Sequence, residues 1–225
     1  MFLTKIDLDP RRRQTRRYLG SPQVMHAVIM KAVDGAQQDD SGRVLWRVDQ
    51  TVGTSLYLLS PTEPDCTQII EEAGAEDAIQ RTLDYSPFLN RLAEDQIWAF
   101  RLMASPTRSV PTGMPNQRGK RYGHVTIAQQ RDWLIRRANG FGFALVPTSG
   151  DDEADVLLDI HRRERPVFGR KNPDHETRDK VTINRTLYEG VLRVIDPDQL
   201  RHSLTHGIGR SKAYGCGLMT LARPD

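Results

Sequence analysis

Strand-like and helix-like periodicities alternate twice along the chain, and this order restricts the fold more than any other feature of the sequence. Residues 2–7 alternate as in a half-buried strand, and Ser21 with Pro22 marks the start of a helix. Apolar residues then follow the i, i+3, i+4, i+7, i+8 spacing of an amphipathic helix, at Met25, Val28, Ile29, Ala32 and Val33. Gly35 fits the end of this helix. Segments 44–48 and 55–60 indicate strands, and segment 65–72 a second helix. This half predicts β-α-β-β-α, with a closing strand that the pattern does not locate.

The second half repeats the order. A strand is expected over 96–104, and Thr126 with Gln129 resembles a capping box that opens a helix ending near Gly140. Further strands are expected over 143–146, 156–160 and 181–187, and the last of these continues past Gly190 to residue 195. A glycine inside a strand indicates a bulge or a close backbone approach. A helix over 197–204 and a strand over 217–221 end the chain.

Both halves therefore indicate β-α-β-β-α-β, which is the ferredoxin-like unit. The predicted fold class is α+β, with two tandem ferredoxin-like domains, and the 225 residues are enough for both. The boundary lies within 84–95, where Ser86-Pro87 interrupts the pattern. We divide the chain into residues 1–88 and 89–225. No repeat is visible in the sequence itself.

Composition narrows the functional classes. The chain is 38% apolar and has no apolar run of the roughly 18 residues that a transmembrane helix needs, so no membrane partner is expected. Residues 1–8 lack the apolar stretch of a signal peptide, which makes the cytoplasm the expected location. Cys66 and Cys216 stand outside any C-x-x-C or Cys/His cluster and are read as small buried fillers. No metal and no cofactor is expected.

The net charge is only +3, yet the basic residues are segregated from the acidic ones. Any one basic run can be ordinary solvated surface, but several together favour a polyanionic partner. The runs occur at Arg11-Arg12-Arg13 with Arg16-Arg17, at 118–121, at Arg131, Arg136 and Arg137, and at 162–171. Acidic residues gather elsewhere, at 71–72, 76–77 and 151–155.

The six histidines are scattered and show no metal-binding spacing such as H-E-x-x-H. His26 differs from the others because it borders the apolar stripe of the first long helix, with Gln23 and Met30 on its face. From position alone, a hydrogen-bonded structural histidine is the favoured interpretation of His26.

The most specific motif is the tail G-I-G-R-S-K-A-Y-G-C-G, residues 207–217, between a helix and the last strand. Glycines allow backbone amides to approach a phosphate closely, and Arg210 and Lys212 add charge. A dinucleotide-binding fingerprint follows a strand and opens a helix, and a P-loop needs G-K-[ST], so neither fits. A tight turn that needs small residues is the alternative.

This ending, H-G-I-G-R-S-K-A-Y-G-C-G-L-M-T-L, resembles the glycine-rich loop of the CRISPR repeat endoribonucleases, most closely the CasE branch of the type I-E (Cascade) system. The start M-F-L-T-K-I-D-L-D-P, the M-H pair on the first long helix, F-R-L-M-A-S-P and L-Y-E-G-V-L-R-V-I-D-P are similar to the same branch. The resemblance covers nearly the whole chain, although residues 65–95 match poorly.

The resemblance implies two ferredoxin-like domains that bind the stem-loop of CRISPR repeat RNA and cut at the 3′ base of the stem without a metal. The products are a 2′,3′-cyclic phosphate, or its opened form, and a 5′-hydroxyl. The protein is then expected to stay bound to the guide RNA together with other Cascade subunits.

The family's catalytic histidine maps onto His26, whose ordinary pKa suits proton transfer near neutral pH. Lys31 is a secondary candidate for charge stabilisation, although it lies about 140° around the helix. Some relatives carry a tyrosine where this chain has Gln23, which can orient RNA but is a poor proton donor. Tyr18 or Tyr214 is a candidate to help instead.

RNA binding is expected from basic and glycine residues, because A-form stems are recognised through backbone and shape. The stretch 156–180 resembles the family's basic hairpin, and 118–121 is a further phosphate candidate. The predicted RNA-binding residues are Arg11, Arg12, Arg13, Arg162, Arg163, Arg165, Arg170, Lys171, Gly207, Gly209, Arg210 and Lys212.

Two alternatives stay open. The first is a catalytically weak or inactive RNA-binding structural subunit, which Gln23 favours. The second is a nucleotide-binding enzyme that uses the glycine-rich loop, which the position of that loop after a helix argues against.

Overall fold

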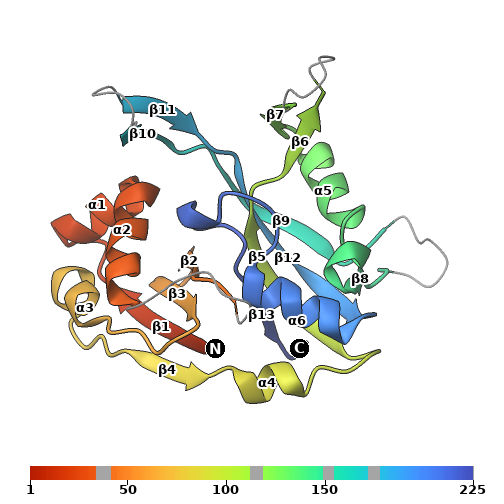
Figure 1. The fold of residues 1–225 in the computed structure, drawn as a ribbon, viewed down its shortest axis with the longest axis horizontal. Helices are drawn as coiled ribbons and strands as arrows, with labels where there is room; N and C mark the ends of the chain where they lie inside the picture. Colours follow the sequence, from red (N-terminus) through yellow and green to blue (C-terminus); the bar gives the residue numbers. More distant parts are fainter. Residues whose placement is uncertain (34–41, 112–118, 149–154, 172–177, 225) are drawn as a thin grey trace.

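The computed structural model describes all residues except 34–41, 112–118, 149–154, 172–177 and 225. The side chains of residues 170, 171, 178 and 179 are likewise outside the described part. The described strands form two larger antiparallel sheets, one in each half of the chain, and two separate hairpins. Figure 1 shows the two halves side by side, with the helices of the first half on its outer side.

The first half has the strand order β2-β3-β1-β4, in which every neighbouring pair is antiparallel. Burial along β1 alternates, as the periodicity predicts. With α2 and α3 as the two connecting helices, this is the ferredoxin-like order, and β4 is the closing strand that the sequence pattern did not locate. The elements are β1 (Phe2–Leu8), α1 (Arg13–Gly20), α2 (Pro22–Ala32), β2 (Leu45–Gln50), β3 (Thr54–Ser60), α3 (Thr67–Ala73) and β4 (Arg81–Asp84).

The second half repeats this order as β13-β5-β12-β8, with β9 also paired to β12. β8 and β9 lie one after the other along the same edge of β12, so together they form one strand of the unit, interrupted between them. Its elements are β5 (Ile97–Ala104), α5 (Ile127–Ile135), β8 (Phe143–Leu145), β9 (Leu158–Glu164), β12 (Arg185–Val194), α6 (Pro197–His206) and β13 (Met219–Ala222). The expected fold of two ferredoxin-like units is confirmed.

Gly190 lies in the middle of β12, where the interrupted edge returns to the sheet. A Cβ atom at this position would lie 2.2 Å from the carbonyl oxygen of Leu157. Only a residue without a side chain permits this approach, so the close backbone contact expected at Gly190 is confirmed. The pairing of β9 with β12 also shifts register between Leu187 and Tyr188.

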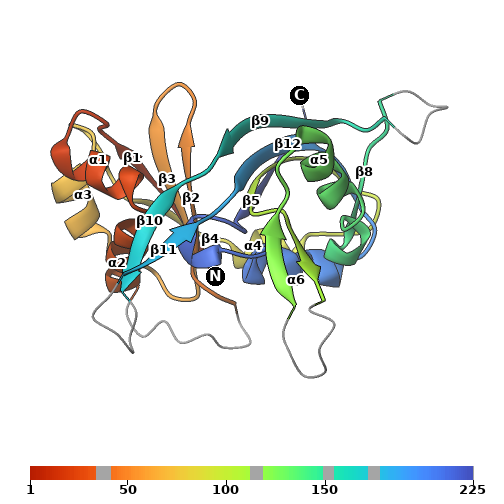
Figure 2. The same ribbon diagram turned by 90° about the horizontal axis from the view of Figure 1, so that it is seen from above.

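Two hairpins extend beyond the sheets and project from the same side of the molecule (Figures 1 and 2). The β10–β11 hairpin reaches from the second half towards α2, and β10 contacts that helix. The two hairpins are formed by β6 (Thr107–Val110) with β7 (Lys120–Gly123), and by β10 (Val167–Lys171) with β11 (Arg178–Thr182). The stretch 156–180 was expected to form a basic hairpin or loop, and the β10–β11 hairpin lies largely within it. The β6–β7 hairpin was not expected.

The local signals for helix starts are reproduced. Ser21 is the N-cap of α2 and Pro22 its first residue, although the Ser21 side chain makes no capping hydrogen bond. Thr126 and Gln129 form the expected reciprocal capping box on α5. α2 ends at Ala32, while Gly35 lies outside the described residues. α1 was not expected as a helix, because its arginines were read only as a basic run.

The two halves share one hydrophobic core. Leu45 and Leu59 of the first sheet belong to the same buried cluster as Phe100 and Leu102 of the second. A smaller cluster packs α2 and α3 against the first sheet alone. The expected division between residues 88 and 89 falls inside the short helix α4 (Ser86–Asn90), and it stays a prediction.

A buried arginine also joins the halves. Arg47 on β2 is 1% exposed, and its guanidinium donates to both carboxylate oxygens of Asp49, at 2.7 and 2.9 Å. Its remaining donors reach the second half, at the backbone oxygens of Arg101 (2.8 Å) and Leu218 (3.1 Å) and the hydroxyl of Thr220 (3.0 Å). The junction is therefore fixed by directed hydrogen bonds as well as by apolar packing.

Candidate functional site

A cleft of about 1020 Å³ lies at the junction of the two halves. One wall comes from α2 and from Arg43, just before β2. The opposite wall comes from β6, the end of α5 and the 3-10 turn η1 (Asn139–Phe141). Residues 209–214 of the glycine-rich tail line the space between them. The most specific motif of the sequence and the first long helix therefore meet in one cavity.

Helix α2 presents His26 and Gln23 to this cleft, on adjacent turns. Its other face, which includes Met25 and Ile29, is buried in the core, so the helix cannot rotate away. The Nδ1 atom of His26 and the Oε1 atom of Gln23 are buried without a hydrogen-bond partner among the described residues. Buried polar atoms without partners are costly, and these two belong to residues that line the same cleft.

Arg43 adds a permanent positive charge next to His26. Its backbone N–H donates to the carbonyl oxygen of Thr205 at 3.2 Å, which ties this segment to α6. Its Nε atom is also buried without a partner in the described part of the chain. Burial lowers the pKa of His26 below its ordinary value, and the nearby Arg43 cation lowers that pKa further. His26 is therefore neutral near pH 7.

The glycine-rich tail, here called the glycine loop (207–217), is folded into the junction. The N–H of Ile208 donates to the carbonyl oxygen of Gly217 at 2.9 Å and closes the loop. Gly215 has φ +77°, and a Cβ atom there would lie 2.7 Å from the ring of Trp46. Gly207 has φ +80° and approaches Leu45 equally closely. Glycine is required at both positions, by backbone conformation and by contact with the first half.

Lys212 begins the 3-10 turn η2 (Lys212–Tyr214), which packs against α2. Its side chain is partly buried, with Cγ 3.1 Å from where a Cβ atom of Gly217 would be. Burial lowers the pKa of Lys212, and Arg43 and Arg210 lower it further. Lys212 lines the same cleft as His26.

Positive charge accumulates in this cleft. The charged groups that shift the pKa values of His26 and Lys212 are all cations. His206 of α6 has a lowered pKa through burial, and His202, Lys212 and Arg43 add to the shift. Such mutual repulsion is relieved when an anion binds, so the cleft is suited to a phosphate group.

An aromatic surface lies opposite the cations. Trp133 and Phe141 line the cleft, with their ring centroids 6.5 Å apart, and the guanidinium carbon of Arg137 lies 5.5 Å from the Trp133 ring centroid. Trp133 is 5% exposed and its ring packs against Tyr188, so it supports this wall from within the core. Arg137, which is exposed, and Phe141, which is half-buried, are the planar groups that can stack on a nucleobase. The cleft can therefore receive the two components of a nucleotide chain, a phosphate and a base.

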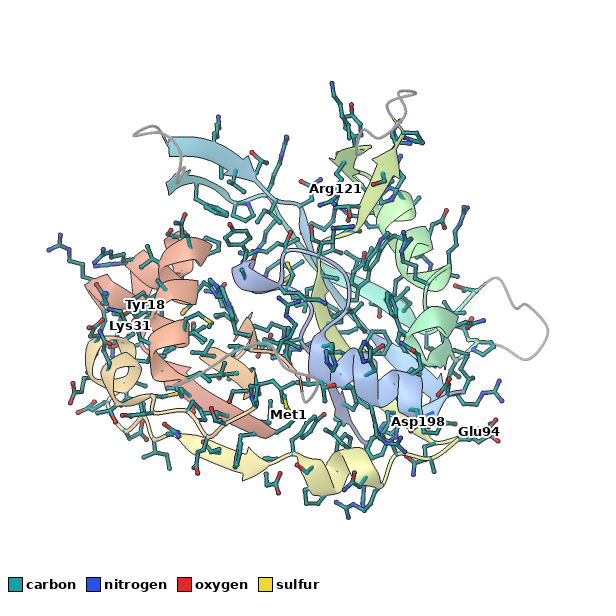
Figure 3. The ribbon with its side chains drawn as sticks, in the orientation of Figure 1. Met1, Tyr18, Lys31, Glu94, Arg121 and Asp198 are labelled. Carbon is teal, nitrogen blue, oxygen red and sulfur yellow. The ribbon has the colours of Figure 1, made fainter. Side chains whose placement is uncertain are left out.

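Lys31 is not part of this cleft. It is exposed at the end of α2 and lies close enough to Glu72 of α3 to lower the pKa of that carboxyl group. The Tyr18 hydroxyl donates to the same Glu72 carboxylate. Figure 3 shows Tyr18 and Lys31 together on the helical side of the first half. Of the two tyrosines considered from the sequence, Tyr214 lines the cleft, and Tyr18 does not.

The first arginine run also lies apart from the cleft. Arg11 pairs with Asp9, and Arg12 donates to the backbone oxygen of Glu71 at 2.7 Å. Arg13 is exposed and lines a separate shallow depression with Arg12 and Arg17. These residues are not brought together with His26. Their role in RNA binding stays a prediction.

The second arginine run divides into two groups. Arg162 donates to Gln50 of β2 at 2.9 Å, and Arg163 donates to Gln130 of α5 at 2.9 Å, so both hold the fold together. Arg165 is exposed, and among the described hydrogen bonds and ion pairs it has no partner within the protein. Arg170 and Lys171 are on β10, but their side chains lie outside the described part of the chain.

Two classes of site find no support in the described part of the chain. No three His, Cys, Asp or Glu side chains gather there in a way that could hold a metal ion. None of the described helices is long and apolar enough to cross a membrane. Cys66 and Cys216 are both buried as free thiols.

Comparison with known proteins identifies the group to which this cleft belongs. A family model described as CRISPR associated protein matches residues 1–223. The chain belongs to this CRISPR-associated family. This confirms the family that the glycine loop and the M-H helix predict.

The members that it resembles are consistent with the cleft. CRISPR-associated endoribonuclease Cse3 of Thermus thermophilus is 32% identical over 225 residues, which is 99% of this chain and 100% of that protein. A structure of Cse3 bound to a 19-nucleotide RNA is 29% identical and has a TM-score of 0.80, covering 99% of this chain and 100% of that one. A chain of a pre-nicking CRISPR RNA-guided surveillance complex is 28% identical, with a TM-score of 0.62 and full coverage of both chains.

Sequence reasoning missed Arg43 and the aromatic wall. Arg43 stands outside every basic run, so charge counting passes over it. Trp133 was recognised only as part of a helix, and Arg137 only as a member of a helix and of a basic run. The four-residue spacing of Trp133 and Arg137, which puts both on one helical face, is a signal that could have indicated them.

Proposed function

We propose that this chain is a metal-independent endoribonuclease that binds the stem-loop of CRISPR repeat RNA and cuts at the 3′ base of the stem. The observation that carries the proposal is the cleft itself. There His26, with a lowered pKa and no hydrogen-bond partner at Nδ1 among the described residues, lies among cations next to the glycine loop. The relative named Cse3 is an endoribonuclease, and a similar structure has RNA bound.

The chemistry follows from these groups. Attack of a 2′-hydroxyl on the adjacent phosphorus leaves a 2′,3′-cyclic phosphate and a 5′-hydroxyl, and it requires proton transfer and neutralisation of a crowded phosphate. His26 can exchange a proton near pH 7, which contributes about 10²–10⁴-fold to such reactions. Arg43 supplies fixed charge, and Gln23 can hydrogen-bond a phosphate oxygen or the RNA backbone.

We further propose that the chain remains on its product as a subunit of a Cascade complex. Its similarity to a chain of an RNA-guided surveillance complex supports this role. The cytoplasm is the proposed location, because the substrate transcript is present there.

A second candidate function is an RNA-binding subunit with weak or no cleavage activity. The observation in its favour is Gln23, which occupies the cleft beside His26 and has no acidic proton to donate. Binding needs only the cations and the stacking wall. Cleavage needs proton transfer as well.

One experiment tests both candidates. Cognate repeat RNA is incubated in EDTA with the wild type and with His26→Ala, and binding is measured in parallel. We expect cutting by the wild type, a loss of about 10²–10⁴-fold in the variant, and unchanged affinity. Tight binding without cutting by the wild type would instead support the second candidate.

A matched RNA with a single 2′-deoxy residue at the scissile position provides the chemical control. It should bind as the normal RNA does and remain intact. If it is cut, the 2′-hydroxyl is not the nucleophile, and the proposed chemistry is wrong.

A further inference from the structure

Cleavage of this kind moves two protons, and the cleft must supply a group for each. One proton leaves the attacking 2′-hydroxyl, and another reaches the departing 5′-oxygen. His26 lines the cleft, and a neutral imidazole has one ring nitrogen that can accept a proton. In an in-line displacement the attacking 2′-oxygen and the departing 5′-oxygen lie on opposite sides of the phosphorus, so one imidazole does not reach both, and a second group is required.

The described cleft lining offers few proton donors. Arg43, Arg137 and Arg210 carry charge but do not release protons at accessible pH. Gln23 has no acidic proton. The ring of Tyr214 packs against Phe168 with centroids 4.9 Å apart, which orients it towards β10. Lys212 is the remaining strong candidate, on the turn that packs directly against the helix carrying His26.

We propose that Lys212 is the catalytic acid of this cleft and that it protonates the 5′-oxygen while neutral His26 accepts the proton of the 2′-hydroxyl. This inference rests on the endoribonuclease function proposed above. It gives Lys212 a role distinct from general phosphate attraction. Lys31 cannot take this role, because its position on α2 directs it away from the cleft. Lys212 of the glycine loop takes the role instead.

The step balances without another reactant. The 2′-oxygen forms a bond to phosphorus as its proton passes to His26. The bond from phosphorus to the 5′-oxygen breaks, its electron pair stays on that oxygen, and the ammonium group of Lys212 supplies the proton. The cleft is left with a protonated His26 and a neutral Lys212, and exchange with water restores both.

The environment of Lys212 suits this task. Lys212 is half-buried on a turn that packs against α2, and it lines the same cleft as His26. Burial and the neighbouring Arg43 and Arg210 lower the pKa of Lys212 from its ordinary 10.5, which makes the ammonium group a stronger acid than a solvated lysine. Arg43 remains charged throughout and can stabilise the phosphorane.

The test compares two RNAs that differ in one atom. In the second RNA, sulfur replaces the 5′-bridging oxygen at the scissile position, and a thiolate leaves without needing a proton. Single-turnover rates are measured in EDTA for the wild type, Lys212→Ala and His26→Ala. We expect Lys212→Ala to lose about 10²–10⁴-fold on the oxygen RNA and to recover most of that loss on the sulfur RNA. His26→Ala should be slow on both.

Each other result overturns the assignment. An equal loss on both RNAs would show that Lys212 supplies charge and not a proton. Recovery of His26→Ala on the sulfur RNA would reverse the two roles. If Lys31→Ala cuts the oxygen RNA slowly and the sulfur RNA at a normal rate, while Lys212→Ala cuts both normally, Lys31 is the acid. The same pattern in Tyr214→Phe would transfer it to Tyr214.

Lys212→Arg separates charge from proton donation. The arginine keeps the positive charge, so affinity for the RNA should stay near that of the wild type, while cutting of the oxygen RNA stays slow. Cutting at the wild-type rate would overturn the proposal. If the wild type cuts neither RNA, the proposed function itself fails, and this outcome is distinct from a failure of Lys212→Ala alone.

Discussion

The two halves of the chain share one strand order, yet they differ in what is added to it. The described part of the first half adds one short helix, α1, to the basic unit. The second half adds two hairpins and interrupts one strand between β8 and β9. The first half supplies His26, Gln23 and Arg43 to the site. The second half supplies the glycine loop, the aromatic wall and both hairpins.

This difference separates two tasks. A proton-transfer group must be held within a narrow range of positions, and a short helix packed on a sheet provides that rigidity. A long nucleic acid needs extended surface, which hairpins and loops can provide at little cost to the core. The cleft lies where the two halves meet, so neither half contains a complete site. The following predictions test how strongly each half depends on the other.

The largest effect is expected from the buried arginine at the junction. Arg47→Met leaves the Asp49 carboxylate buried beside only Arg101, and removal of one partner of a buried ion pair costs about 3–5 kcal/mol. The free energy of unfolding, measured with urea, should fall by this amount. The double variant Arg47→Met with Asp49→Leu should recover much of it. A single variant as stable as the wild type would mean that the halves do not depend on this junction.

A smaller effect is expected from the glycine loop. Gly215→Ala forces a side chain into a left-handed conformation, at a cost of about 1–2 kcal/mol, and places its Cβ against Trp46 of the first half. We expect a loss of stability of at least this size, together with slower RNA cutting because η2 moves relative to α2. Thermal unfolding and single-turnover cleavage measure the two effects.

Gly20→Ala is the matched control. Gly20 ends α1, has no positive φ, and has nothing within 4 Å of where its Cβ would be. This change should leave both stability and cutting close to those of the wild type. If Gly215→Ala and Gly20→Ala change stability and cleavage equally, the close contact of Gly215 with Trp46 does not determine either property.

The smallest effect is a change in pH dependence. The Arg43 cation disfavours protonation of His26, so Arg43→Met should raise the pKa of His26. The neutral, proton-accepting form then appears only at higher pH, and the acid limb of kcat/KM for cleavage moves upward. The pKa should stay below its ordinary value, because burial is the larger cause. An acid limb that does not move, or moves downward, would contradict the electrostatic coupling of Arg43 to His26.

Short-range signals were the predictable part of this fold. The starts of α2 and α5 follow from Pro22 and the Thr126 capping box, which act within one helical turn. The tandem order of strands followed from periodicity. α1 was hidden because its arginines obscure the three-residue spacing of the buried Thr15 and Tyr18. The β10–β11 hairpin is basic and only weakly alternating, so periodicity alone could not separate its strands from β9 and β12.

The sequence predicted only those residues of the candidate site that belong to a recognisable motif, namely His26 and the glycine loop. The helix angle already indicated that Lys31 points away from His26, and the structure places it beside Glu72. Arg43 could not be found, because its position depends on a backbone contact with Thr205, distant in sequence. The partners of Arg162 and Arg163 are likewise remote in sequence. Charge patterns locate basic residues, but they do not distinguish those that bind a ligand from those that brace the fold.

The hydrogen bond between Ile208 and Gly217 has a thermodynamic consequence. It closes the glycine loop within the folded chain, and contacts with Leu45 and Trp46 hold the loop on one side. The conformational entropy of ordering about ten residues is therefore lost during folding and not again when a phosphate is captured. Such preorganisation raises the affinity for a phosphate without adding any contact to it.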